Sequence, residues 1–177
     1  MTRRAWSAEL PLAGPAGEPV DLWRSIQSHG LVDLPPMRID DEARALEITI
    51  PLPSGRPRTV RIARGRPGHA LVTVAGRPPG PRQADDLLAA VAHVLRLDED
   101  LSAFYAAAAA DPQLAWAARG AGRLVRSPTV FEEVVKTICT TNCAWSATER
   151  MVGALVEHLG EPAVGVRDGP YGRAFPG

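Results

Sequence analysis

The sequence predicts an α+β protein in which a small antiparallel sheet precedes a helical region. Two patterns predict this class. Apolar residues alternate over residues 46–74, as in half-buried strands, and recur every three or four positions over residues 83–159, as in amphipathic helices. The proline-rich segment 77–81 separates the two patterns, because no regular element crosses it. We therefore expect a sheet domain at residues 1–80 and a helical domain at 81–177.

Three strands are predicted in the first part, joined by turns at residues 53–55 and 65–68. Their apolar residues are Leu46, Ile48, Ile50 and Leu52, then Val60 and Ile62, then Leu71, Val72 and Val74. Short connections of this kind favour an antiparallel meander. Before the strands, residues 22–28 are expected to form a short helix and residues 29–36 a loop that enters the sheet.

Three helices are expected to follow the proline-rich segment. The first covers residues 83–97 and the second starts after the acidic stretch 98–100, with Leu101, Phe104, Tyr105 and Ala108 on one face. Asp111 and Pro112 have the form of a helix start, and Gly120 is placed to end that third helix.

Two further helices form a hairpin at residues 127–160. Thr129 and Glu132 predict a capping box for the first of them, and Ser146 and Glu149 predict another for the second. The expected buried residues are Phe131, Val134, Val135 and Ile138, then Val152, Leu155, Val156 and Leu159. Lys136 is expected to face solvent. The short connection at 141–145 makes the helices antiparallel and leaves their turn exposed.

Composition excludes several classes of protein. Basic and acidic residues number 20 each, so global charge gives no argument for nucleic acid and any DNA affinity must come from local patches. The chain contains neither the apolar core of a signal peptide nor a stretch of about 18 apolar residues, so we expect a cytoplasmic protein without membrane contact. Cys139 and Cys143 lack metal-site spacing and are expected to be reduced, partly buried thiols. No metal or cofactor is expected.

The exposed turn at residues 140–145 is the main candidate site. An enzyme that works on a base must rotate it out of the duplex, at a cost of a few kcal/mol, and a rigid tip can fill the gap. Asn142 suits this role because its amide offers a donor and an acceptor to base edges. The alternative, from chemistry alone, is a hairpin whose Thr and Asn side chains cap backbone groups.

Arginines are the candidate phosphate contacts. Arg119, Arg123 and Arg126 precede the hairpin, near the side expected to face DNA. A second set of arginines could also contact phosphate, because no acidic residue lies between its members. Such residues more often form a solvated sheet face and turns. The set consists of Arg56, Arg58, Arg61, Arg64, Arg66, Arg77 and Arg82.

Two stretches of the sequence resemble one enzyme superfamily. Residues 134–160, VVKTICTTNCAWSATERMVGALVEHLG, are similar to the DNA-penetrating hairpin of the helix-hairpin-helix (HhH-GPD) DNA glycosylases, in their 8-oxoguanine and 3-methyladenine II branches, and residues 111–135 resemble the approach to it. The resemblance implies that Asn142 enters the gap with Thr140, Thr141 and Cys143 supporting it, and that the sheet is TATA-binding-protein-like. Cys143, Ala144 and Ala147 depart from the 8-oxoguanine type, which argues against strict opposite-cytosine recognition.

The resemblance also implies what the chain lacks. The superfamily's second hairpin, of the type Leu-Pro-Gly-Ile-Gly, and its later catalytic Asp have no counterpart in residues 167–177, where Asp168 has the wrong surroundings. No residue is therefore assigned a catalytic role. We expect the N-terminal part of a mono- or bifunctional glycosylase, nucleoid-associated in the cytoplasm, that acts on double-stranded DNA with an alkylated or oxidised base in base-excision repair and is inactive alone. The alternatives are a non-catalytic sensor of distorted DNA and a helical protein-interaction domain.

Overall fold

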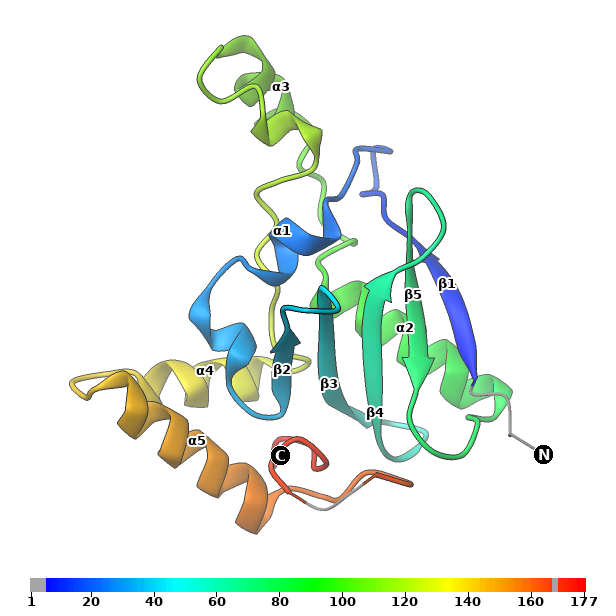
Figure 1. Ribbon diagram of the computed structural model, residues 1–177, viewed down its shortest axis with the longest axis vertical. Coiled ribbons are helices and arrows are strands. Elements are labelled where there is room, and N and C mark those ends of the chain that lie inside the picture. The colour runs from blue at the N-terminus through cyan, green and yellow to red at the C-terminus, as the bar shows by residue number, and fades with distance from the viewer. Residues whose placement is uncertain (1–5, 167–168) are drawn as a thin grey trace.

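A five-stranded antiparallel sheet lies at the centre of the molecule, with helices on one face and along one side (Figure 1). The computed structural model describes residues 6–166 and 169–177, so the predicted role of Asp168 lies outside the described residues. Strand order is β1-β5-β4-β3-β2. The α+β class predicted from the two periodicities is confirmed.

The predicted meander forms the middle of the sheet. It consists of β3 (Ala45–Leu52), β4 (Gly55–Arg64) and β5 (His69–Val74). Ile48 is paired with Val60, and Ile62 with Val72, so the alternating apolar residues meet across strands and are fully buried. Two edge strands, β1 (Ser7–Pro11) and β2 (Met37–Asp40), were not predicted, because each is too short to display a clear alternation.

One hydrophobic core joins the sheet to two helices. α2 (Pro81–Val94) places Leu87, Val91 and Val94 against the apolar face of the sheet, and α1 (Leu22–Ile26) adds its own apolar residues. The helices expected near residues 83–97 and 22–28 are therefore present, each ending slightly earlier than predicted. Because α2 shares this core, packing is continuous across the boundary that composition places at residue 80.

α3 (Ser102–Ala110) and the 3₁₀ turn η2 (Ala117–Arg119) form a projection at one end of the molecule (Figure 1). The helix predicted to begin at Asp111 is wrong. The Asp111 carboxylate accepts a hydrogen bond from the Gln113 N–H, and the chain passes through turns rather than a helix. This Ala-rich segment buries little apolar surface, and a short isolated helix is marginal without it. Phe104, predicted to be on the buried face of α3, is 45% exposed.

α4 (Val130–Cys139) and α5 (Trp145–Leu159) form the predicted hairpin. Val152 and Val156 of α5 are buried in a second core with Leu34 and Phe175, whereas Leu159 is 66% exposed. Thr129 accepts a hydrogen bond from the Glu132 N–H at 3.1 Å, as a capping residue should. The second predicted capping box is wrong, because Ala144 occupies the N-cap of α5 and Ser146 already lies within the helix.

Candidate nucleic-acid interface

The turn between α4 and α5 is held by side chains that satisfy the end of α4. The last carbonyls of a helix have no partner within it. Here the Thr140 hydroxyl donates to the Thr137 carbonyl at 2.7 Å, and the Thr141 hydroxyl donates to the Ile138 carbonyl at 2.8 Å. These bonds fix the C-terminal turn of α4.

A second group of contacts ties the turn to α5. The Thr148 hydroxyl donates to the Cys139 carbonyl at 2.7 Å, and the Cys143 thiol lies 2.9 Å from the same oxygen. The Cys143 sulfur is also 3.3 Å from the Thr148 hydroxyl. Both cysteines are free thiols, with Cys139 half-buried as expected and Cys143 exposed. The two helices are thus linked through one shared carbonyl, which makes the tip rigid.

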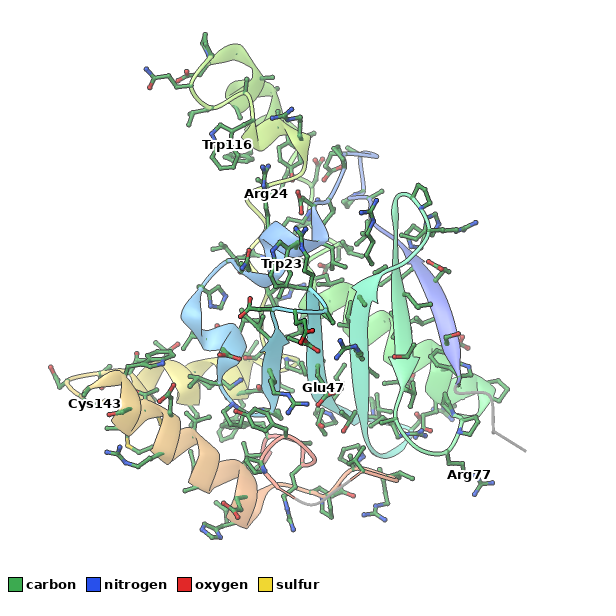
Figure 2. All side chains as sticks on the ribbon, viewed as in Figure 1. Trp23, Arg24, Glu47, Arg77, Trp116 and Cys143 are labelled. Carbon is green, nitrogen blue, oxygen red and sulfur yellow. The ribbon has the colours of Figure 1, made fainter. Side chains whose placement is uncertain are left out.

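Asn142 differs from its neighbours in the turn. Its side chain is exposed, and within the described residues its amide makes no hydrogen bond. Its backbone has φ of 53°, a left-handed conformation that Asn tolerates better than most residues. Figure 2 places the adjacent Cys143 at the outer end of the hairpin. The turn therefore presents one free carboxamide on a tip whose other polar side chains cap α4.

Two of the three predicted arginines are engaged in ion pairs within the protein. Arg123 is 2% exposed, and its guanidinium donates to Glu18 at 2.7 Å. Arg126 forms ion pairs with Asp98 at 2.6 Å and Glu99 at 3.1 Å. Arg119 is exposed in η2, and Figure 2 places Trp116, which lies three residues earlier in the chain, well away from Cys143.

The inner face of α4 carries a buried ion pair. The Lys136 ammonium lies 2.7 Å from a Glu132 carboxylate oxygen, donates to the Leu34 carbonyl at 3.3 Å and lies 6.0 Å from the centre of the Phe175 ring. Both side chains are fully buried, so the expectation that Lys136 faces solvent is wrong. Burial raises the pKa of the Glu132 carboxyl, and the charge of Lys136 opposes this rise.

The outer face of α4 is apolar and uncovered. Phe131, Val134 and Ile138 are 55%, 50% and 61% exposed, and Val130 is 79% exposed. The predicted burial of Phe131, Val134 and Ile138 is wrong, because the helix turns its ion pair toward Leu34 and Phe175 and its apolar stripe outward. Val135, the fourth residue of the predicted stripe, is half-buried. A contiguous exposed patch of this kind marks a surface for contact with another element or molecule.

The described residues contain neither a cluster of metal-ligating side chains nor a helix that could span a membrane. Nowhere in residues 6–166 and 169–177 do three His, Cys, Asp or Glu side chains gather in a way that could hold a metal ion. In the same part of the chain, every helix is too short or too polar to cross a membrane.

Comparison with known proteins identifies the fold. No family model matches the sequence, and no curated protein matches it significantly. Among solved structures, the molecule is similar to a 3-methyladenine DNA glycosylase from Archaeoglobus fulgidus, with a TM-score of 0.67 and 20% sequence identity over 97% of this chain. The match covers 55% of the Archaeoglobus chain, so the present sequence spans about half of that protein's length. The molecule therefore has a DNA glycosylase-like α+β fold over the part that it spans.

Proposed function

We propose that this chain is the DNA-wedging part of a DNA N-glycosylase of the HhH-GPD type, which hydrolyses the bond between a damaged base and its sugar. The substrate is double-stranded DNA with an alkylated or oxidised base, and the setting is base-excision repair in the cytoplasm. The observation that carries this proposal is the free Asn142 amide on the rigid hairpin tip. The similarity to a glycosylase supports it at the level of the fold.

The wedge follows from the arrangement of the turn. An inserted group must resist being pushed back by the stacked bases, and Thr140, Thr141 and Thr148 supply that resistance by tying the turn to both helices. In the gap, the Asn142 amide can donate to and accept from the edge of the orphaned base. Thr140, Thr141 and Cys143 then support the wedge from behind, because their polar groups are already engaged.

The exposed apolar face of α4 supports the proposal that this chain is one part of a longer enzyme. Four apolar side chains stand exposed there, and the match leaves about half of the similar glycosylase's chain uncovered. We infer that further helices of a longer polypeptide cover Val130, Phe131, Val134 and Ile138, and that those helices bring the catalytic carboxylate. We therefore expect base release only from the longer polypeptide, in which those helices cover α4.

Asn142→Gly is expected to weaken binding to a duplex with one abasic site about tenfold, which corresponds to the loss of one to two hydrogen bonds. Glycine accepts the positive φ of 53° at this position, so the variant removes the amide without straining the turn. The measurement is fluorescence anisotropy with abasic and intact duplexes. Gln27→Ala changes an exposed amide at the C-cap of α1; it serves as the control and should bind like the unaltered chain.

Two outcomes of this titration would argue against the wedge. A group that fills a gap must bind an abasic duplex more tightly than an intact one. Equal affinity of the unaltered chain for the two duplexes would therefore contradict the wedge. Unchanged binding by Asn142→Gly, with affinity independent of salt, would favour a protein-interaction hairpin, because contacts with phosphates weaken as salt rises.

The double variant Phe131→Ser/Ile138→Ser is expected to weaken self-association of the 177-residue chain at least tenfold. In the isolated chain the apolar face of α4 is available to a second copy, and each large side chain contributes roughly 1 kcal/mol or more when its remaining surface is buried. Sedimentation velocity over a concentration series measures the shift. Leu124→Ser, at a residue 48% exposed elsewhere, is the control. A wild-type chain that remains monomeric at high concentration and melts cooperatively would contradict this expectation.

An activity assay distinguishes the glycosylase hypothesis from the alternative of a non-catalytic sensor. The present chain and a version extended through its downstream reading frame are compared for base release from duplexes that contain an alkylated or an oxidised base. Release by the extended protein alone supports the glycosylase. Tight binding to distorted DNA by both versions, without release by either, supports a sensor.

A further inference from the structure

We propose that a cavity between α1 and two sheet turns binds the phosphate group of a small organic phosphate. The cavity has a volume of about 460 Å³, within the range of roughly 300–1,000 Å³ that small-molecule sites occupy. Its walls come from four segments distant in sequence: Leu12 after β1, residues 20–23 at the start of α1, residues 43–44 between β2 and β3, and residues 64 and 66–69 around the β4–β5 turn. Figure 2 places Trp23, in its wall, well away from Cys143 at the hairpin tip.

The cavity is lined by an excess of positive charge. Arg44, Arg64 and Arg66 line it, and Asp21 is the one carboxylate in its wall. Asp21 already accepts a hydrogen bond from the Arg24 N–H at 3.1 Å and lies 3.7 Å from the Arg24 guanidinium. Glu9 lies beside the β4–β5 turn, 3.5 Å from the Arg66 N–H, but does not line the cavity. The lining therefore contributes three arginines against one carboxylate, which Arg24 already engages.

His69 orients one of these arginines. Its Nε2 lies 2.7 Å from Nη2 of Arg66, which can only donate, so Nε2 accepts this hydrogen bond. Its Nδ1 lies 3.1 Å from the Pro67 carbonyl and therefore carries the proton. His69 thus positions the Arg66 guanidinium through Nε2, and the rest of the guanidinium fork remains for a ligand.

Arg44 is placed by an unusual backbone conformation. Its φ is 49°, in the left-handed region that Gly and Asn normally occupy, and its guanidinium lies 5.2 Å from the centre of the Trp23 ring. A non-glycine residue held there is under backbone strain, which is a common feature of functional turns. The guanidinium of Arg64, at the end of β4, makes no hydrogen bond or ion pair within the described residues. One arginine is thus pre-positioned and another is free.

A phosphate is the ligand chemistry that this arrangement recognises. Guanidinium groups match phosphate oxygens with paired, charge-assisted hydrogen bonds, and three of them suit an anion with two negative charges. The partly buried Trp23 and the apolar Leu12 and Leu22 leave room beside the anion for an organic group. The phosphate can belong to a free mononucleotide or to a DNA backbone, and the experiment separates these sources.

Isothermal titration of the full chain with adenosine monophosphate and with inorganic pyrophosphate tests the proposal. Saturable binding is expected, and Arg64→Gln and Arg66→Gln should each weaken it about tenfold, the loss of a charge-assisted hydrogen bond. Arg82→Gln removes an exposed arginine outside the cavity and should leave affinity unchanged. Asn142→Gly should also leave it unchanged, so failure of this site and failure of the wedge are distinguishable.

Competition with undamaged duplex DNA identifies the source of the phosphate. If the duplex displaces the bound nucleotide and Arg64→Gln weakens duplex binding, the cavity receives a backbone phosphate. If the duplex does not compete, the ligand is a free phosphate compound. The proposal is overturned if neither probe binds saturably, or if Arg82→Gln weakens binding as much as Arg64→Gln does, because the interaction is then general attraction between charges.

Discussion

Lys136→Met is expected to destabilise the protein by about 3–5 kcal/mol, because the change leaves the fully buried Glu132 carboxylate without its partner. The Leu34 carbonyl also loses its donor. Urea unfolding at pH 7.5, followed by circular dichroism, measures the change in the free energy of unfolding. Since the pair lies on the inner face of α4, the variant should also loosen the hairpin and weaken binding to the abasic duplex.

The loss in free energy of unfolding that Lys136→Met causes should depend on pH. The pKa of Glu132 is raised by burial and held down by Lys136, so it rises further in the variant. A group with a raised folded pKa stabilises the protein below its unfolded pKa, about 4.3, and that stability is lost as pH rises through the folded pKa. The deficit relative to wild type should therefore be larger at pH 8 than at pH 5.

A double variant provides the matched control for this experiment. Glu132→Leu/Lys136→Met removes both charges together and should be close to wild type in stability, or above it, because well-packed apolar residues often replace a buried pair without loss. If the double variant is as unstable as Lys136→Met, shape rather than charge accounts for the loss. The conclusion that the ion pair determines which face of α4 is buried would then be wrong.

Arg123→Met is expected to lower the free energy of unfolding by about 3 kcal/mol, also through a broken buried pair. The Arg123 guanidinium joins Glu18, in the N-terminal loop, to the carbonyls of Arg96 and Glu99 in the connection after α2. Removing it leaves those acceptors and the Glu18 carboxylate short of a donor. Arg24→Met breaks an exposed pair with Asp21 and should cost no more than about 1 kcal/mol.

The pH dependence of Arg123→Met has the opposite sign. Burial alone would raise the pKa of Glu18, but the N–H groups of Leu101, Glu18 and Ala16 and the charge of Arg123 lower it below its ordinary value. A lowered folded pKa gives stability above the unfolded pKa, about 4.3, and this is lost as pH falls through the folded pKa. The deficit should be complete at pH 7 and shrink below about pH 4. A deficit that grows on acidification would contradict the ion pair.

Local patterns in the sequence predict much of the fold. The alternation from Leu46 to Val74 places the central strands, because alternation by itself determines which side chains share a face of a sheet. The cap at Thr129 and the short turn before Trp145 likewise predict the hairpin from the sequence, because helix capping and loop length depend only on residues close together in the chain. The exposed position of Asn142 follows from the same short turn.

Other features depend on residues distant in sequence. Periodicity assigned Phe131 and Ile138 to the core, yet contacts with Leu34 and Phe175 place Glu132 and Lys136 inside, and the ion pair makes their burial tolerable. Nothing near Arg123 in the chain identifies Glu18 as its partner, and nothing near Arg64 identifies the cavity at Trp23. The sequence by itself determined the elements and the exposed turn, because hydrogen bonding and periodicity are local. The tertiary structure alone decided which faces are buried and which arginines share a cavity, because burial depends on the elements that pack together.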